Sequence, residues 1–150
     1  MRYKLSRRQG VRRKLTAMVG KQDFVELAAF RKALRKFLRF AEEGAVEAGI
    51  TPQQHQVLLA IRAHPGRDWA TVSELADSLQ LKHHATVGLV DRCQTAGLVE
   101  RTIDPDDRRV VRVSLSDRGM EILIKLTERN LGELKALGKL TAELEALAQG

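Results

Sequence analysis

Apolar residues recur every three or four positions between residues 23 and 48, which places them along one face of a helix. The opposite face is strongly basic. We therefore predict a long amphipathic helix over residues 23–48, ended by Gly49 and Ile50. The apolar positions are Leu27, Phe30, Leu34, Phe37, Ala41 and Ala45, and the basic ones are Arg31, Lys32, Arg35, Lys36 and Arg39.

Two capping boxes mark the starts of the next two helices. The run Thr51-Pro-Gln-Gln combines an N-cap, a first-turn proline and a glutamine that can bond back to the cap. It predicts a helix over residues 51–63. The run Thr71-Val-Ser-Glu repeats the box and predicts a short helix over residues 71–79.

A fourth helix and a β-hairpin follow a turn at Gln80 and Leu81. The helix is predicted over residues 82–96, with Gly97 as its left-handed C-terminal residue. Segments 98–103 and 110–115 are rich in β-branched residues, and a polar, charged stretch separates them. They predict a hairpin with a charged tip.

The C-terminal segment is again helical in pattern. Ser116 can cap a fifth helix, whose apolar residues recur to about residue 137. We predict that Gly138 breaks this helix and that Thr141 caps a last short helix over residues 142–148.

The predicted order of elements is that of a winged helix-turn-helix in a mainly α protein with a small β-hairpin wing. The outer segments, residues 23–50 and 116–150, exceed what a DNA-binding domain over residues 51–115 needs. Their apolar stripes are expected to pack against a second copy, because a two-fold dimer presents two reading heads to a palindromic DNA site. The residues assigned to this interface are Leu27, Phe30, Leu34, Leu134, Leu137, Leu144 and Leu147.

The net charge of +7 is concentrated at the N-terminus, because residues 1–20 carry seven basic residues and no acidic one. This basic arm, residues 1–22, can bind phosphates or anionic lipid, or it can be a solvated lead-in. The chain has one cysteine, no secretory signal and no apolar run of membrane length. We therefore expect a cytoplasmic protein without a membrane partner.

Six short runs, in order and at consistent spacing, resemble the MarR family of bacterial transcription regulators over residues 24–148. The resemblance implies a triangular homodimer with two winged lobes that bind double-stranded DNA and usually repress transcription. It also implies release by a small aromatic or phenolic effector, or in some members by oxidants or metals. The runs are Thr51-Pro-Gln-Gln, Thr71-Val-Ser-Glu-Leu-Ala, Gly88-Leu-Val-Asp-Arg, Ala96-Gly-Leu-Val-Glu-Arg, Asp104-Pro-Asp-Asp-Arg-Arg and Val113-Ser-Leu-Ser-Asp-Arg-Gly.

The helix over residues 82–96 is the candidate recognition helix. Helical spacing turns Thr86, Leu89, Val90 and Cys93 inward. The candidates for DNA contact lie in its first turn and on its outward face, and they are Lys82, His83, His84, Val87, Gly88 and Arg92.

These candidates have different expected roles. The imidazoles can donate to guanine or phosphate acceptors, and Val87 can contact a thymine methyl group. In the family, the position of Arg92 contacts DNA and the position of Gly88 often holds a base-reading arginine. A glycine there is expected either to let the DNA backbone approach or to pack against another helix.

Two further groups are expected to contact DNA. Thr71 and Ser73 begin the third helix, where hydroxyl and N–H groups can hold a phosphate, although Thr71 also serves as a cap. Asp107-Arg108-Arg109 matches the Asp-x-Arg wing tip of the family. The carboxylate of Asp107 can orient Arg109 for a narrow minor groove, while Arg108 contacts phosphate. The alternative is an ordinary solvated turn.

Other residues have competing interpretations. His83 and His84 point about 100° apart on a helix, so one metal ion cannot easily bind both, and we predict no metal site. Cys93 is expected to be a core residue and not a redox sensor. His55 either lies in the core or lines a ligand pocket. Trp69, in the loop before the third helix, packs either under the wing or against a ligand.

No nucleotide-binding, hydrolase or Cys-x-x-Cys motif is present, so we expect neither an enzyme nor a cofactor. The sequence leaves open two alternatives to a ligand-responsive repressor. One is a winged-helix DNA-binding protein without an effector. The other is a protein-interaction module that uses the winged fold.

Overall fold

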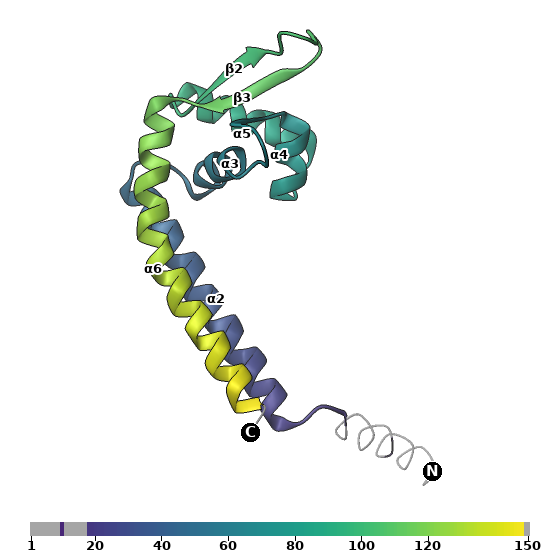
Figure 1. Ribbon diagram of the computed structural model, residues 1–150, viewed down its shortest axis with the longest axis vertical. Coiled ribbons are helices and arrows are strands. Elements are labelled where there is room, and N and C mark those ends of the chain that lie inside the picture. Colours follow the sequence, from purple (N-terminus) through teal and green to yellow (C-terminus); the bar gives the residue numbers. More distant parts are fainter. Residues whose placement is uncertain (1–9, 11–17, 149–150) are drawn as a thin grey trace, which may run out of the picture. The chain divides into compact units, whose positions relative to one another are not determined.

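The computed structural model describes Gly10 and residues 18–148, except for the side chains of Leu144, Leu147 and Ala148. The seven basic residues counted in residues 1–20 of the predicted arm lie outside this part. The chain divides into two compact units, residues 1–38 with 133–150 and residues 39–132. Its elements are α2 (Lys21–Glu47), α3 (Pro52–Arg62), β1 (Trp69–Ala70), α4 (Val72–Leu79), α5 (His83–Thr95), β2 (Val99–Ile103), β3 (Val111–Leu115) and α6 (Asp117–Ala148) (Figure 1).

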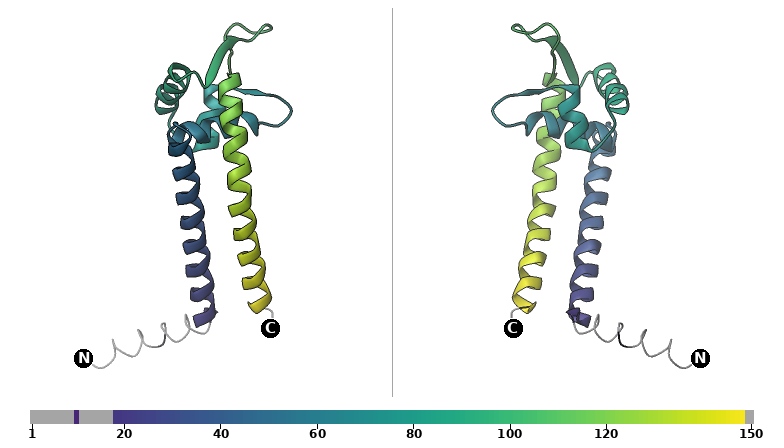
Figure 2. Two further views of the ribbon diagram at one scale, coloured as in Figure 1. Left: turned by 90° about the vertical axis from the view of Figure 1, so that its left-hand side faces the viewer. Right: turned by 90° about the vertical axis from the view of Figure 1, so that its right-hand side faces the viewer.

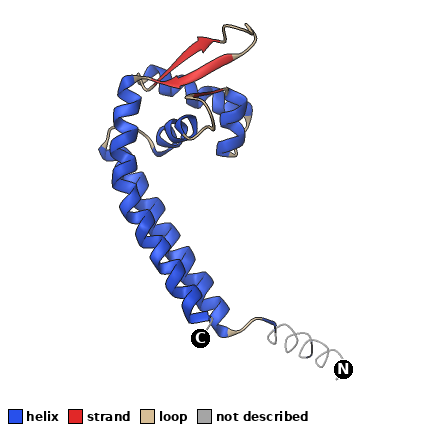
Figure 3. Ribbon diagram, viewed as in Figure 1, coloured by secondary structure: helices blue, strands red, loops and turns tan. Residues whose placement is uncertain are grey.

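The unit of residues 39–132 is a winged helix-turn-helix, as predicted. Helices α3, α4 and α5 pack together, and the β2–β3 hairpin projects beyond them (Figure 2). Apart from this small sheet the described chain is mainly helical (Figure 3). Within residues 18–148, no helix is long and apolar enough to cross a membrane.

Both predicted capping boxes are formed. At α3 the Thr51 Oγ1 accepts the N–H of Gln54 (3.1 Å), and the Gln54 side chain accepts the N–H of Thr51 (2.9 Å). Thr71 and Glu74 make the equivalent pair of bonds at the start of α4. Each box satisfies two backbone donors that the helix itself leaves free, which is why these short local runs identify their helices reliably.

The inward face predicted for the recognition helix is confirmed. Thr86, Leu89, Val90 and Cys93 are the buried residues of α5, and they join the apolar core of this unit. Thr86 keeps its hydroxyl satisfied by donating to the carbonyl of Lys82 (3.0 Å). The core also takes residues from α3, α4 and β3, of which the fully buried ones include Val57, Leu58, Ile61, Leu75 and Val113.

The sheet has one strand more than the hairpin that the sequence predicts. Its order is β1-β3-β2, with antiparallel pairing throughout. The added strand β1 is only two residues long and pairs Trp69 with Ser114 and Ala70 with Val113. The expectation that Trp69 lies in a loop is therefore wrong, because pairing with β3 draws this short segment into the sheet.

Ser116 connects the hairpin to α6 and caps that helix, as predicted. Its Oγ accepts the N–H of Gly119 (3.0 Å) and donates to the carbonyl of Gly97 (2.6 Å). A side chain at position 119 would overlap the carbonyl oxygen of Leu98, so this helix start requires glycine. Gly97 itself has a φ of +71°, as expected for the residue that ends α5.

The predicted break at Gly138 is wrong. Helix α6 continues without interruption over Asp117–Ala148. The hydroxyl of Thr141 donates to the carbonyl of Leu137 one turn earlier (3.0 Å), so it bonds back along the same helix and caps no new one. One glycine costs a helix only about 1 kcal/mol, which the flanking leucines and lysines of good helix propensity can offset.

Candidate nucleic-acid interface

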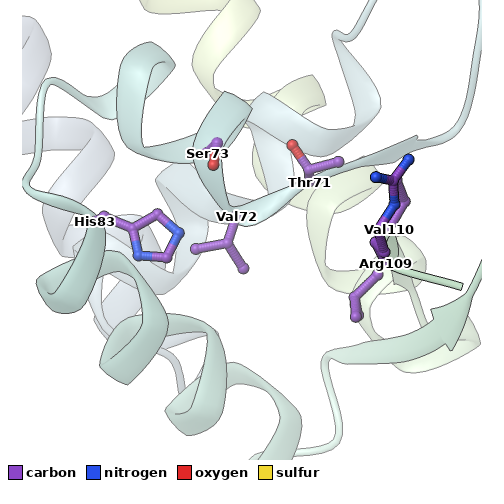
Figure 4. A pocket seen from close by; sticks show the side chains of 7 residues that line it. Thr71, Val72, Ser73, His83, Arg109 and Val110 are labelled. Carbon is purple, nitrogen blue, oxygen red and sulfur yellow. The ribbon is translucent and has the colours of Figure 1, made fainter.

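A concavity of about 360 Å³ lies between the first turn of α4, the start of α5 and the wing (Figure 4). Its polar lining residues come from three segments that are distant in the sequence. Thr71 and Ser73 lie at the start of α4, His83 at the start of α5, and Arg109 on the wing. Val72, Val110 and Val111 complete the lining. The fold thus gathers four of the residues predicted to contact DNA around one opening.

The α4 side of this concavity is rigid because the capping box fixes it. Thr71 Oγ1 accepts the N–H of Glu74 (3.2 Å), and the Thr71 N–H donates to Glu74 Oε2 (2.8 Å). Burial raises the pKa of Glu74, but the bonds from Thr71 and Arg67 and the charges of Arg67 and His64 outweigh it and lower that pKa. The cap is therefore formed by a carboxylate, and the Thr71 hydroxyl still has its hydrogen to donate.

The start of α5 is arranged differently. Lys82 is the N-cap residue, and within the described chain its side chain makes no capping hydrogen bond. His83 and His84 are exposed in the first turn. This end of the helix therefore presents cationic or donor side chains next to backbone N–H groups, a combination that suits phosphate oxygens.

The outward face of α5 carries the remaining predicted contacts. Val87 and Gly88 are partly exposed and Arg92 is exposed. A Cβ at position 88 would meet only the Arg92 guanidinium, at an ordinary distance of 3.5 Å. Helix packing, one of two explanations given for Gly88, therefore does not apply within the described chain. Asp91, on the same face, is paired with Arg101 of β2 (2.6 Å).

The wing tip has the internal geometry that the sequence predicts. Asp107 Oδ1 accepts both the backbone N–H and the Nε–H of Arg109, and Oδ2 accepts from Nη2, each at 3.0 Å. The hydrogen bond to Arg109 lowers the pKa of Asp107 and raises that of Arg109. The Arg109 side chain is nevertheless 90% exposed, so its guanidinium is held in one orientation while it faces solvent. Arg108 is exposed beside it.

A second carboxylate organises the wing where the loop leaves β2, and its role was not predicted from the sequence; Asp104 and its partner Arg112 are called the wing base below, to distinguish them from the loop tip at Asp107 and Arg109. Asp104 Oδ1 accepts the N–H groups of Asp106 (2.8 Å) and Asp107 (3.0 Å), which closes the turn. Its Oδ2 accepts from Nε and Nη2 of Arg112 (2.8 and 2.7 Å). The hydrogen bonds from Asp106 and Arg112 lower the pKa of Asp104 despite burial. The pattern Asp-Pro-Asp-Asp is a recognisable turn signal, whereas the partner eight residues later is not.

Trp69 packs at the wing base, as one of the two interpretations of this residue expects; contact with a ligand stays a prediction. The Arg112 guanidinium lies over its ring at 4.3 Å from the centroid, and the Arg67 guanidinium lies over it at 3.8 Å. Arg67 is in turn paired with Glu74 of the α4 cap. Trp69 thus connects the residues of the wing base to those of the α4 cap.

His55 and Cys93 are both buried. Desolvation lowers the pKa of His55, so the imidazole is held neutral inside the fold. His55 does not line the concavity between α4, α5 and the wing, nor a second one between α3 and α6. Desolvation raises the pKa of the Cys93 thiol to about 11, against weaker opposing effects of Arg92 and Arg101. This environment is that of a structural cysteine and not of a reactive thiolate.

A second concavity, of about 290 Å³, lies between α3 and the first half of α6. Its lining is mostly apolar, with Arg62 and Glu128 as its charged members. The other lining residues are Leu59, Ala63, Met120, Leu123, Ile124 and Thr127.

Among the described residues, no three His, Cys, Asp or Glu side chains are grouped in a way that could hold a metal ion.

The residues assigned to a dimer interface fall in the unit formed by residues 1–38 and 133–150. Leu27, Phe30 and Leu134 are exposed, with Leu27 at 60% and Leu134 at 49%, and Leu34 and Leu137 are partly buried. The side chains of Leu144 and Leu147 lie outside the described part of the chain. Several large apolar side chains of this unit therefore face solvent in a single copy.

Comparisons with known proteins identify relatives of this chain. Residues 48–110 match the family model described as the MarR family. The chain is 34% identical to the transcriptional repressor MdtR of Bacillus subtilis over 61% of its own length and 55% of MdtR, so it spans little more than half of that relative. It is 30% identical to the transcriptional repressor NicR of Pseudomonas putida, over 75% of this chain and 70% of NicR.

The fold of this chain is also similar to that of a solved structure. The MarR protein of E. coli, in a cysteine-to-serine mutant complexed with operator DNA, superposes with a TM-score of 0.63 at 27% identity. The match covers 81% of this chain and 89% of the E. coli chain.

Proposed function

Because this chain belongs to the MarR family of transcription regulators, we propose that it is a homodimeric, sequence-specific DNA-binding regulator. We further propose that it represses transcription and that a small-molecule ligand releases it from a palindromic operator. The function is one of binding and not of catalysis. The repressor assignment is supported by NicR and MdtR, both named transcriptional repressors.

One observation carries the DNA-binding proposal, namely the concavity shared by Thr71, Ser73, His83 and Arg109. Its rim offers hydroxyl, imidazole and guanidinium donors, all of which suit phosphate or base-edge acceptors. Arg109 enters the minor groove in this proposal, and Arg108 contacts phosphate. The outward face of α5 lies in the major groove, with Lys82, His84, Val87, Gly88 and Arg92 as its contacts.

The homodimer is supported by the exposed apolar side chains of α2 and α6. Leu27, Phe30 and Leu134 would lose contact with water in an interface between two copies, which is favourable in proportion to the apolar area removed. A two-fold dimer has a self-complementary interface and fits a palindromic site. Sedimentation equilibrium of the full chain is expected to give twice the mass of the monomer.

The ligand is proposed to occupy the apolar concavity between α3 and α6, which can accept a small aromatic molecule. Its volume of about 290 Å³ is at the lower limit of known ligand pockets, which span roughly 300–1,000 Å³. A thermal-shift screen of aromatic acids and phenols tests this proposal, because a ligand that binds only the folded state raises the melting temperature. Leu59→Trp, which adds bulk at an exposed position of the lining, is the matched variant and is expected to lose the shift. If no compound shifts the wild type, the effector-free alternative gains support.

DNA binding is tested by selection from a randomised duplex pool at near-physiological salt, with the wild type and Arg109→Ala compared. We expect a palindrome whose half-sites are about 10 base pairs apart, and weaker binding by the variant. A pool without enrichment would contradict DNA recognition and favour a protein-interaction module. Enrichment with equal affinity of both proteins would contradict only the role of Arg109.

A further inference from the structure

A continuous series of side-chain contacts joins the two sides of the DNA-binding concavity. On the α4 side, Glu74 caps the helix and is paired with Arg67. On the wing side, Asp104 closes the turn and is paired with Arg112. The two arginines meet at the ring of Trp69, with their Cζ atoms 3.8 Å and 4.3 Å from its centroid.

We propose that Trp69 is a positioning residue for DNA binding. It holds the wing at a fixed separation from the start of α4, so that Arg109 and the pair Thr71 and Ser73 can contact one DNA duplex together. Trp69 itself contacts no DNA in this proposal. The inference rests on the proposed function, because it assigns a role in the same interface.

The backbone alone provides little of this connection. Strand β1 pairs with β3 through only two residue pairs, whereas β2 and β3 pair through five. The wing is therefore firmly paired within itself but weakly paired to the segment that leads into α4. Side chains on that segment supply the additional contacts, and Trp69 is the largest of them.

The charges around the ring explain how two arginines can share it. Each guanidinium is already paired with a carboxylate, Arg67 with Glu74 and Arg112 with Asp104, so their mutual repulsion is reduced. The face of an aromatic ring attracts a cation. A flat guanidinium can also stack on the ring, which the ammonium group of a lysine cannot do. Removing the ring would leave the two paired arginines without a common neighbour and would free the wing.

The test is a double-mutant cycle on the full chain with the selected operator duplex, using Trp69→Leu and Arg109→Ala. We expect Trp69→Leu to weaken binding about tenfold, which corresponds to about 1.4 kcal/mol. In the Arg109→Ala background the same substitution should change affinity by less than about twofold, because only the Arg108 phosphate contact is then left on the wing for Trp69 to position. Equal effects in both backgrounds would overturn the proposal.

The salt dependence of binding provides a readout that general destabilisation does not move. A protein cation that contacts DNA contributes about 0.9 to the slope of log affinity against log salt concentration. Trp69→Leu removes no cation, yet it should lower the slope by about this amount, as Arg109→Ala does. An unchanged slope would overturn the proposal. Val57→Ala, a buried substitution in α3 that removes no charged group, is the control for lost stability and should leave the slope unchanged.

Two further variants keep the test decisive if Trp69→Leu does not fold. Trp69→Phe keeps an aromatic face and should restore most of the affinity. Arg112→Lys keeps the charge beside Asp104 but loses the stacking, and it should lower affinity and slope together. If Arg112→Lys binds as the wild type does, the proposal is wrong. Failure of the wild type itself to bind any duplex would instead contradict the proposed function.

Discussion

The wing contains two pairs of an aspartate and an arginine with the same chemistry and very different surroundings. At the tip, Asp107 and Arg109 are 38% and 90% exposed. At the base, Asp104 and Arg112 are 12% and 28% exposed. Both aspartates accept hydrogen bonds from backbone N–H groups and from the guanidinium, and both have a lowered pKa.

The difference in burial gives the two ion pairs different roles in one hairpin, because the shielded pair stabilises the fold and the exposed pair serves binding. A pair shielded from water leaves a buried charge behind when one partner is removed, so it contributes to stability. An exposed pair contributes little to stability because water competes with it. What the exposed pair retains is orientation, since Asp107 fixes the direction in which the Arg109 guanidinium meets a ligand.

The largest expected effect comes from Arg112→Leu at the base. Loss of the guanidinium leaves Asp104 with an unpaired oxygen in a buried position, which we expect to destabilise the fold by about 1–3 kcal/mol. Urea unfolding followed by circular dichroism measures this change. If Arg112→Leu were as stable as the wild type, the Asp104–Arg112 ion pair would not contribute to stability, and the proposed difference between the two pairs would be wrong.

The matched substitution at the tip is Arg109→Leu. We expect its free energy of unfolding to match that of the wild type, because the side chain is 90% exposed. Its affinity for the selected operator should fall about tenfold, since a minor-groove arginine is lost. Fluorescence anisotropy with a labelled duplex measures this loss. A stability loss equal to that of Arg112→Leu would remove the distinction between tip and base.

The dependence of stability on pH should also distinguish the pairs. Both carboxyls have a folded-state pKa below the ordinary 3.8, so their contribution is present above that value and is lost as the pH falls below it. We expect Asp104→Asn to flatten the stability profile below about pH 4 more than Asp107→Asn does, because Asp104 is the more shielded group. Urea unfolding at a series of pH values measures both profiles, and equal flattening would contradict the assignment.

The smallest expected effect is that of Asp107→Asn on DNA binding. The amide can still accept the Arg109 N–H, but it loses the charge that orients the guanidinium. We expect affinity to fall about threefold, the size typical of an exposed ion pair, with no change in the salt slope. Anisotropy titrations at several salt concentrations measure both quantities. A loss as large as that of Arg109→Leu would mean that Asp107 also shapes the turn.

The elements that the sequence predicts well are those whose signals are local. The capping boxes at Thr51 and Thr71 involve residues three positions apart, and both are formed. The inward face of α5 follows from helical spacing alone. The Asp107–Arg109 geometry was predictable for the same reason, because two residues on one turn can reach each other whatever the rest of the fold does.

The features that could not be predicted depend on contacts distant in the sequence or on a balance of small energies. Strand β1 forms only because β3 lies beside it, and the two paired residues Trp69 and Ser114 are 45 positions apart in the chain. Arg112 finds Asp104 across the hairpin, and no local pattern marks that partner. Helix α6 continues through Gly138 because the helix propensity of the neighbouring residues offsets the cost of one glycine, about 1 kcal/mol.

The burial of Cys93 has a practical consequence for experiments on this protein. A thiol with a pKa of about 11 is almost entirely un-ionised at neutral pH, and the side chain has no exposed surface, so alkylating reagents cannot attack it in the folded state. Cysteines introduced on the wing can therefore receive spectroscopic labels without removal of the native one. Cys93 itself becomes reactive only when α5 separates from the core around it. The rate at which it is labelled in the folded protein therefore reports how often this part of the fold opens.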